Sequence, residues 1–156
     1  MSEVDISNFK KVGKVVSQQD PFNVGVQLKV CSEIYLIDDM DIQNHCVKLF
    51  GEGEYKELIG VQAIGAVWKE DKNKFVSMQP FQSWTWDDVN DVWVPPVAKP
   101  NTIGNPTFVN SEGIEQDVYS NVPNWNESEQ RWENLNREDN NNYYWNPSNN
   151  SWTLIE

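Results

Sequence analysis

The chain has 156 residues, 24 of them acidic and 12 basic, and so carries a formal net charge of −12 at neutral pH. This charge opposes the attraction that supplies most affinity for nucleic acids and for anionic membranes, so we expect neither as a partner. No stretch approaches the roughly 18 apolar residues that span a bilayer, and residues 1–11 lack the continuous apolar stretch of a secretory signal. We therefore expect a chain that is made and kept soluble in a cytoplasm.

The first sixty residues predict a small domain that begins with β-strands. Val12–Val16 is expected to form a first strand, which Asp20 and Pro21 end. The even positions from Val24 to Val30 are apolar, which is strand periodicity, and Ile34–Ile37 is apolar on both faces, as in an interior strand. An antiparallel sheet is therefore expected to start here.

A helix is predicted over about residues 39–50. Asp38 or Asp39 can cap its start, acids occupy its first turn, and Gly51 suits the left-handed residue after its end. Lys48 lies in its last turn, where a cation is favourable. Four apolar residues at helical spacing form a stripe that is expected to pack on the sheet: Ile42, Cys46, Leu49 and Phe50. Residues 1–60 thus read as one sheet-plus-helix domain.

After residue 60, an aromatic residue is followed seven positions later by another, four times over. The pairs are Trp68 and Phe75, Trp86 and Trp93, Trp125 and Trp132, and Trp145 and Trp152. The residues between them are mostly turn formers, and Pro147 would interrupt a helix in the last module. If the paired residues lie opposite each other in a hairpin, both rings share one face and close a small core. The repeat therefore predicts tandem hairpins with structural aromatic pairs.

Composition divides the rest of the chain into three segments. Residues 61–98 carry the first two aromatic hairpins, and the prolines at 95, 96 and 100 favour an extended path that marks a boundary. Residues 99–120 form a connector with a weak hairpin around 108–114. Residues 121–156 hold the last two hairpins and are so rich in asparagine that we expect them to be mobile in isolation. The fold class expected is α+β and mainly β.

No motif in the sequence indicates catalysis. The acids Asp87, Asp88 and Asp91 lie in a predicted hairpin turn, where solvated carboxylates are expected rather than a glycosidase or metal pair. His45 and the two cysteines, Cys31 and Cys46, have awkward geometry for zinc, so both cysteines are expected to be buried as small apolar groups. We predict a protein that is not an enzyme, without catalytic, cofactor-binding or metal-binding residues and without a cofactor.

Two binding interpretations of the aromatic residues stay open. Exposed rings on hairpins can stack on sugars, which would make the chain a carbohydrate-binding module. Trp132 and Trp152, with Tyr143, Tyr144 and Asn146 between them, are similar to a WW domain that grips proline-rich peptides, although no proline follows Trp152. The competing interpretation is that the paired rings close the small core of each hairpin.

The order of elements in residues 60–156 resembles a group of small virion-associated proteins of tailed phages that infect marine cyanobacteria. The shared order is the segment Pro80–Asp87 with its Ser-Trp strand, a second tryptophan with a proline-rich connector in Trp93–Val97, and a final hairpin from Trp145 to Trp152. Residues 1–60 fit the small domain that precedes the repeats in that group more loosely. The stretch between Pro100 and Trp125 is longer here.

The resemblance implies a non-enzymatic virion component, made in the host cytoplasm and located in the virion. It implies an accessory or decoration protein of head, neck or tail, present in many copies and docked on other virion proteins. Under the carbohydrate alternative, the ligand would be a host-surface glycan.

Overall fold

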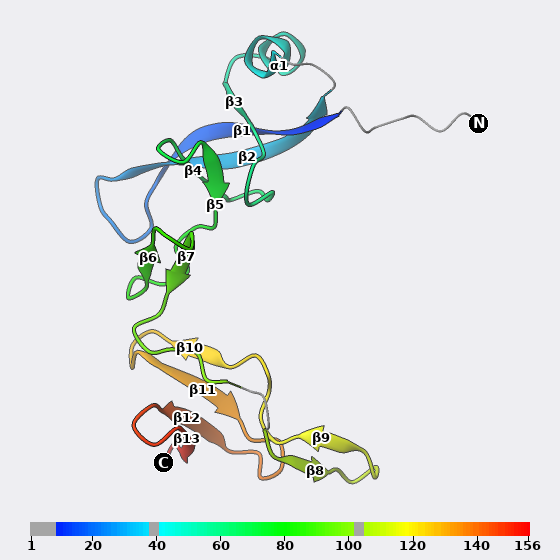
Figure 1. Cartoon of the computed structure of the whole chain (residues 1–156), viewed down its shortest axis with the longest axis vertical. Coiled ribbons are helices and arrows are strands. Elements are labelled where there is room, and N and C mark those ends of the chain that lie inside the picture. Colours follow the sequence, from blue (N-terminus) through cyan, green and yellow to red (C-terminus); the bar gives the residue numbers. More distant parts are fainter. Residues whose placement is uncertain (1–8, 38–40, 102–104) are drawn as a thin grey trace, which may run out of the picture. The chain divides into compact units, whose positions relative to one another are not determined.

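The computed structural model describes residues 9–37, 41–101 and 105–156. It divides into two compact units (Figure 1): unit 1 is Met1–Pro80 with Asp88–Val92, and unit 2 is Phe81–Asp87 with Trp93–Glu156. The described chain is mainly β with one helix, an N-terminal antiparallel sheet and several further antiparallel hairpins, which confirms the predicted fold class.

Unit 1 is built on a five-stranded antiparallel sheet in the order β3-β1-β2-β4-β5. Its strands are β1 (Lys10–Gln19), β2 (Gln27–Ile37), β3 (Glu54–Glu57), β4 (Val67–Lys69) and β5 (Lys74–Val76). The two long strands β1 and β2 form a ribbon that dominates this unit (Figure 1). The predicted first strand is thus confirmed, and its partner is the second predicted strand.

The turn between β1 and β2 takes up residues that the apolar alternation assigned to a strand. The Asp20 carboxylate accepts hydrogen bonds from the backbone N–H groups of Phe22 and Asn23, at 2.8 and 3.2 Å. Val24 is fully exposed and Val26 is 45% exposed, and both precede β2. The predicted strand start at Val24 was therefore wrong, because the aspartate closes a turn that extends the loop.

The second half of β2 is more exposed than predicted. Ile34 and Leu36 are 37% and 50% exposed, so this half of the strand is not buried on both faces. The reason is the pairing, since β4 meets β2 at Val30 opposite Val67 and leaves the distal half of β2 beside β1 alone. Although β2 lies in the interior of the sheet, its neighbour β4 has only three residues and so covers only part of it.

Unit 1 has two clusters of buried side chains, one on each face of the sheet. The first consists of Val15, Cys31, Leu58, Ala66, Trp68 and Phe75, and the second of Val12, Ile37, Cys46 and Tyr55. Neighbouring residues of a strand point to opposite faces. Gly13 accordingly faces the first cluster, where an added Cβ would lie 2.8 Å from the Cys31 sulfur. Both cysteines are buried thiols, and their burial is as predicted.

The single described helix, α1, spans Ile42–Phe50, so the predicted start near residue 39 was wrong. Its cap is Asp41, whose side chain accepts a hydrogen bond from the backbone N–H of Asn44. The predicted caps Asp38 and Asp39 lie outside the described residues. The first turn holds no acid, contrary to prediction, because the acids precede the helix. Lys48 in the last turn and the positive φ of 91° at Gly51 are as predicted.

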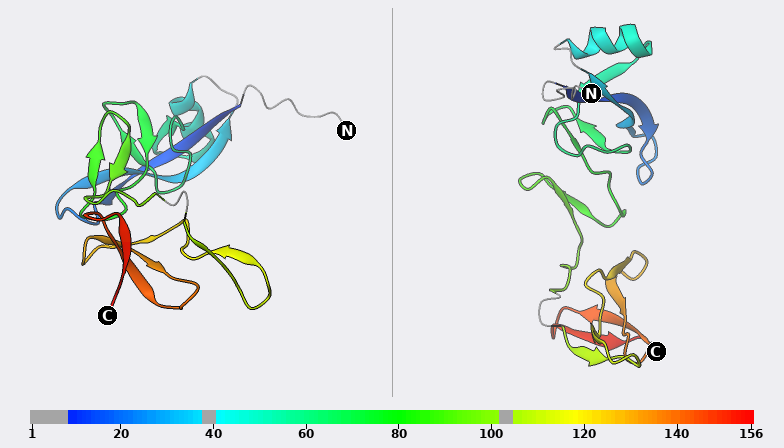
Figure 2. Two further views of the ribbon diagram at one scale, coloured as in Figure 1. Left: turned by 60° about the horizontal axis from the view of Figure 1, so that its bottom comes forward. Right: turned by 90° about the vertical axis from the view of Figure 1, so that its right-hand side faces the viewer.

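The apolar stripe of α1 was predicted correctly only in part. Cys46 is fully buried, and Ile42 and Val47 pack against the second cluster. Leu49 is 57% exposed and is not among the residues that pack against this cluster. Phe50 lies at the margin and stacks on Tyr35, with ring centroids 4.0 Å apart. The inward face of this short helix therefore includes Val47 in place of Leu49. Figure 2 shows α1 beside β3 in two further views.

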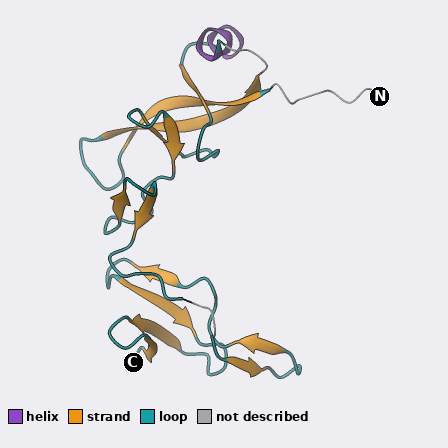
Figure 3. Ribbon diagram, in the orientation of Figure 1, coloured by secondary structure: helices purple, strands orange, loops and turns teal. Residues whose placement is uncertain are grey.

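Unit 2 contains a four-stranded antiparallel meander in the order β10-β11-β12-β13. Its strands are β10 (Asn124–Asn126), β11 (Arg131–Leu135), β12 (Asn142–Asn146) and β13 (Ser151–Leu154). Two separate two-stranded ribbons precede it in the chain: β6 (Thr85–Asp87) with β7 (Val92–Val94), and β8 (Thr107–Val109) with β9 (Glu115–Asp117). Figure 3 shows that the described part of this unit consists of strands and loops.

The units divide the chain differently from the four sequence segments. The two hairpins expected together in residues 61–98 belong to different units. The hairpin β4–β5 lies in unit 1, whereas β6 and most of β7 lie in unit 2. The first hairpin joins unit 1 because β4 pairs with β2, and because Trp68 and Phe75 complete the first buried cluster. The weak hairpin expected around residues 108–114 is present as β8–β9, with Gly113 in its turn at φ 79°.

All four aromatic hairpins turn in the same way. The residue five positions after the first ring has a positive φ in each: Asn73 (49°), Asp91 (55°), Gln130 (48°) and Asn150 (52°). In β4–β5, β10–β11 and β12–β13, the strand residues that flank the loop pair directly, which leaves four residues in each turn. The β11–β12 connection repeats this turn without an aromatic pair, with Asn140 at 60°. Asparagine and aspartate tolerate this conformation better than most residues.

The asparagine density of the last segment has a structural use. Asn126, Asn136 and Asn146 stand ten residues apart, each directly before a turn of the meander. Their side-chain oxygens accept hydrogen bonds from the backbone N–H groups of Glu129, of Glu138 with Asp139, and of Ser148, respectively. The ten-residue spacing is a second repeat, and it defines the meander more completely than the aromatic spacing does.

Candidate interaction surface

The seven-residue spacing brings the expected rings together. Trp68 lies opposite Phe75, Trp125 opposite Trp132, and Trp145 opposite Trp152. Ring centroids in these pairs and in Trp86–Trp93 are 5.0, 5.2, 5.5 and 5.2 Å apart, and the planes meet at 65–67°. This edge-to-face geometry is the favoured arrangement of aromatic quadrupoles.

The four pairs differ in burial, which separates two roles. Trp68 with Phe75 and Trp125 with Trp132 are at most 8% exposed and belong to the cores. Trp86 with Trp93 and Trp145 with Trp152 are only partly buried. The first two pairs are therefore scaffold, whereas the second two present ring area that a partner can reach.

A carboxylate holds the first tryptophan of each buried pair. Trp68 Nε1 donates to Glu70 Oε2 at 2.6 Å, and Trp125 Nε1 donates to Glu127 Oε2 at 2.8 Å. The Trp68 hydrogen bond is the main cause of a lowered pKa at Glu70. A tryptophan followed two residues later by glutamate thus fixes the ring orientation within the module.

Glu127 also binds a segment that lies far from it in the chain. It accepts hydrogen bonds from the Ser83 backbone N–H at 2.8 Å and from Ser83 Oγ at 2.7 Å. The Ser83 hydroxyl, followed by the Trp125 indole, lowers the pKa of the Glu127 carboxyl. This one carboxylate therefore joins the chain before β6 to the hairpin β10–β11.

Trp84 covers the third aromatic pair. Its ring centroid lies 6.1 Å from that of Trp125 and 6.0 Å from that of Trp132, and Phe81 packs against it at 5.6 Å. Trp132 Nε1 in turn donates to the backbone oxygen of Val97 at 2.8 Å. Residues on both sides of the β6–β7 ribbon thus pack on β10–β11. Sequence reasoning missed Trp84 because it stands outside the seven-residue spacing.

Tyr119 packs on the fourth aromatic pair, as Trp84 packs on the third. Its ring stacks on Trp152 at 5.1 Å and meets Tyr143 edge-on at 5.6 Å. The buried Asn134 holds this segment, since its side-chain amide donates to Ser120 O and accepts from Ser120 N–H. Burial is the main cause of a raised pKa at Tyr119. No spacing in the sequence marks Tyr119 or Asn134, which depend on a long-range packing.

Alternation along the strands places the large rings of the meander on one face. Trp125 pairs with Trp132, Asn134 with Tyr143, Tyr143 with Leu154, and Trp145 with Trp152. The partly buried Tyr143, Trp145 and Trp152, together with Leu154 at 44% exposure, form what we call the C-terminal aromatic face. On the opposite face, the Arg131 guanidinium lies 4.8 Å from the Tyr144 ring and pairs with Glu133.

The two-stranded ribbons expose several apolar side chains. Val89 and Val92 of the β6–β7 hairpin are 88% and 46% exposed. Val109 and Ile114 of the β8–β9 hairpin are 67% and 51% exposed. These side chains and, separately, the C-terminal aromatic face are apolar surface that another protein could contact.

The acids of the second hairpin turn serve structural ion pairs. Lys72 Nζ lies 3.1 Å from Asp88 Oδ1 and 2.7 Å from Asp91 Oδ1, and Lys74 also pairs with Asp91. The hydrogen bonds from Lys72 and then Lys74 lower the pKa of Asp91, which opposes the raised pKa of a general acid. These contacts hold the turn within unit 1. Within residues 9–37, 41–101 and 105–156 there is no group of three or more His, Cys, Asp or Glu side chains positioned for a metal ion.

Comparison with known proteins found no matching family model, no matching curated protein and no matching solved structure. In the part of the chain that the structure describes, no helix has the length and apolar character needed to cross a membrane.

Proposed function

We propose that this protein is a non-enzymatic structural component of a tailed-phage virion, an accessory or decoration protein that docks in many copies on other virion proteins. The order of aromatic and proline elements from residue 60 onward, which resembles small virion proteins of phages of marine cyanobacteria, supports the virion part of this proposal. Contacts of the described residues support the docking part.

The observation that carries docking is the exposure of apolar side chains on β6–β7 and β8–β9. An isolated two-stranded hairpin is marginally stable at best in water. Each ribbon nevertheless leaves valine or isoleucine side chains exposed by 46% or more, at Val89, Val92, Val109 and Ile114. A protein partner that covers them would gain apolar burial of about 25 cal/mol per Å² and would stabilise the ribbons at the same time.

The charge of the chain fits a protein partner of the opposite sign. Residues 101–156 carry nine acids and only Arg131 and Arg137 as bases. Such a surface steers association with basic protein surfaces and disfavours nucleic acid. We therefore place the partner among virion proteins rather than on the packaged genome.

The two alternative interpretations have less support from the rings themselves. A sugar needs an open ring face, and two of the four pairs, Trp68 with Phe75 and Trp125 with Trp132, are at most 8% exposed. A WW-like groove needs an accessible Trp132, but this ring is 5% exposed and its Nε1 donates to Val97 O. Docking on a protein uses the exposed valine and isoleucine side chains of the two ribbons, and it does not require an open face on any paired ring.

The direct test is mass spectrometry of purified particles of the phage that encodes the chain. We expect its peptides at a constant ratio to the major capsid protein after density-gradient purification and a high-salt wash. Proteins of the host lysate that are washed away serve as the control. A chain found in the lysate and missing from washed particles contradicts the proposal.

A second test removes the proposed contact without touching the cores. The double variant Val109→Ser, Ile114→Ser changes only exposed residues of β8–β9. We expect it to fold normally by circular dichroism and to be depleted from particles in competition with the unchanged chain. The matched double variant Ser111→Ala, Glu112→Gln in the same turn is expected to assemble normally.

A further inference from the structure

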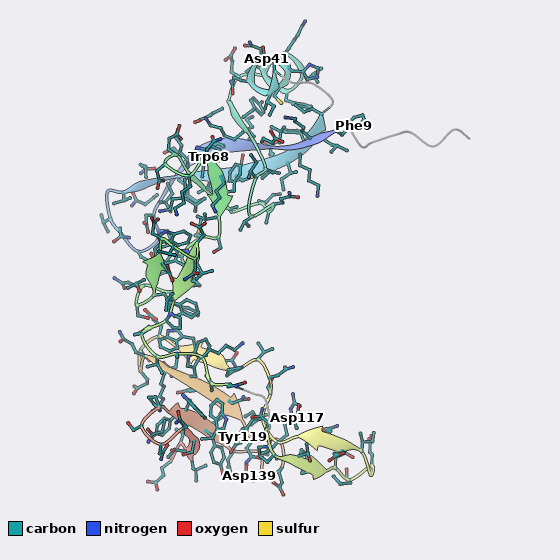
Figure 4. The ribbon with its side chains drawn as sticks, viewed as in Figure 1. Phe9, Asp41, Trp68, Asp117, Tyr119 and Asp139 are labelled. Atoms are coloured by element: carbon teal, nitrogen blue, oxygen red, sulfur yellow. The ribbon has the colours of Figure 1, made fainter. Side chains whose placement is uncertain are left out.

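The second half of β2 forms an open sheet edge in unit 1 that the docking proposal does not use. β1 accompanies β2 as far as Ile37, whereas β4 and the residues just before it bond to β2 no further than Cys31. In Figure 4, Trp68 marks β4, and Phe9 marks the end of the β1–β2 ribbon where β2 finishes. Within the described residues, the outer side of Glu33–Ile37 therefore has no strand beside it.

The pairing register shows which backbone groups face this edge. Lys11 O accepts a hydrogen bond from the Leu58 N–H at 2.8 Å, so the backbone of Lys11, and with it that of Gly13, faces β3. Leu36 and Ile34, which lie opposite these two residues, accordingly direct their backbone groups away from β1. In the part of the chain that the structure describes, the N–H and C=O groups of Ile34 and Leu36 have no hydrogen-bond partner.

The side chains of this edge are apolar on one face and aromatic on the other. Ile34 and Leu36 are 37% and 50% exposed and share the face of Gly13, which is that of the first buried cluster. Tyr35 points to the other face, where it packs against the second cluster and stacks on Phe50. Lysine or proline within an edge strand discourages pairing, and residues 33–37 contain neither. The edge is thus open to another strand.

We propose that this edge pairs with the same edge of a second copy, in an antiparallel dimer whose twofold axis passes beside Tyr35. Ile34 of each copy then lies opposite Leu36 of the other, and each such pair exchanges two backbone hydrogen bonds. On the other face, the two Tyr35 rings lie directly opposite each other, where aromatic cross-strand pairs are favourable. A twofold interface needs a patch that is complementary to itself, and the order Ile-Tyr-Leu meets this requirement.

The charges beside this edge also suit a second copy. In this register, Glu33 lies opposite Ile37 of the second copy, and the next residue across is Lys10 of that copy. Glu33 has Lys14 of its own copy 3.9 Å away, and Lys10 pairs with Glu57 at 3.0 Å, so cations flank each Glu33. The two Glu33 residues are about 13 Å apart along the strands and do not meet. Salt screens the long-range repulsion that the net charge of −12 produces.

The shortness of the edge predicts a weak dimer. Five residues from each copy bury less than the roughly 800 Å² per partner of a standard stable interface. Association should therefore depend on concentration and should be favoured where many copies gather on one surface. Strand pairing does not depend on what that surface is, so the dimer is a separate claim from the proposed virion role.

Disulfide trapping in the full-length chain tests the register. Residues opposite each other at a non-hydrogen-bonded position have Cα atoms about 4.5 Å apart, within the range that a disulfide spans. Tyr35→Cys should therefore form a covalent dimer on mild oxidation about tenfold faster, or more, than Glu33→Cys at equal concentration. Glu33→Cys is the matched control, because residue 33 is more exposed but lies about 13 Å from its symmetry mate. The unchanged chain, whose two cysteines are buried, should give no covalent dimer.

A second variant tests the dimer with Tyr35 left in place. Leu36→Lys changes a half-exposed residue outside both buried clusters and puts a lysine on the edge, which opposes pairing. In sedimentation at moderate ionic strength, the unchanged chain should dimerise as its concentration rises towards the millimolar range, and Leu36→Lys should stay monomeric. Val16→Lys, an exposed apolar position of β1 away from this edge, is the matched control and should dimerise normally. Circular dichroism of each variant confirms folding.

Three results would overturn this inference. The first is that folded Tyr35→Cys cross-links no faster than Glu33→Cys. The second is that the unchanged chain stays monomeric at the highest concentration. The third is that Leu36→Lys dimerises as well as the unchanged chain, because the contact would then lie on another surface. The presence of the chain in virions is measured separately, so the two proposals can fail independently.

Discussion

The two units of this protein solve the problem of a small core in different ways. Unit 1 surrounds a five-stranded sheet with conventional clusters of aliphatic and aromatic side chains, covered on one face by α1. Unit 2 has no comparable aliphatic cluster among its described residues, and its stability depends on ring pairs, asparagine-capped turns and two covering rings, Trp84 and Tyr119. The contrast teaches that one aromatic module can serve either design. The hairpin β4–β5 completes the core of unit 1, while β10–β11 supplies the buried ring pair of unit 2.

Phe75→Ala should give the largest effect and should act on unit 1. The Phe75 ring is 1% exposed within the first buried cluster, so its loss leaves a cavity that costs about 3–5 kcal/mol in the free energy of unfolding. Urea denaturation measures the loss, and amide hydrogen exchange assigns it to one unit. Faster exchange confined to unit 2 would contradict the assignment of β4–β5 to the core of unit 1.

Trp84→Ala should destabilise unit 2 by about 1–3 kcal/mol, because it removes the ring that packs on both Trp125 and Trp132. Amide exchange of β10 and β11 is the measurement. Trp86→Ala, two residues away and on a two-stranded ribbon, is the matched control and should change exchange of the meander little. Equal effects of the two variants would show that Trp84 does not cover the third pair.

Glu127 should make unit 2 sensitive to acid. Hydrogen bonds from Ser83 and Trp125 lower its pKa in the folded state below the ordinary value of 4.5. Its stabilising contribution is therefore complete above that value and is lost as the pH falls through the lowered pKa. We expect Glu127→Gln to lower the melting temperature of unit 2 at neutral pH and to reduce its dependence on pH below about 4.5. Thermal melts at several pH values check this, with Glu129→Gln in the same turn as control.

Gln130→Gly should give the smallest effect and the opposite sign. Gln130 is held at a φ of 48°, which glycine adopts without strain, so the change should stabilise unit 2 by about 0.5–1 kcal/mol. Ser128→Gly in the same turn is the control, since Ser128 is not among the residues of positive φ and should lose stability. Denaturant midpoints of both variants decide whether the turn is as described.

Local features of this molecule could be predicted from its sequence, whereas its long-range packing could not. The spacing of Trp125 and Trp132 predicted a hairpin with its register, because turn chemistry is local. The start of α1 was predicted three residues early because several aspartates compete as caps, and Asp41 is the one observed. Trp84, Tyr119 and Asn134 could not be predicted, since their roles depend on contacts between residues 14 to 48 positions apart in the chain.

Hydrogen exchange of the ribbons, compared between the free chain and purified particles, tests the central claim most directly. If the protein docks through its exposed apolar residues, the amides of β6–β7 and β8–β9 should exchange within seconds in the free chain and become strongly protected in the particle. The first buried cluster of unit 1 should exchange slowly in both states and serves as the internal reference. Ribbons that exchange equally fast in both states would contradict docking through these surfaces.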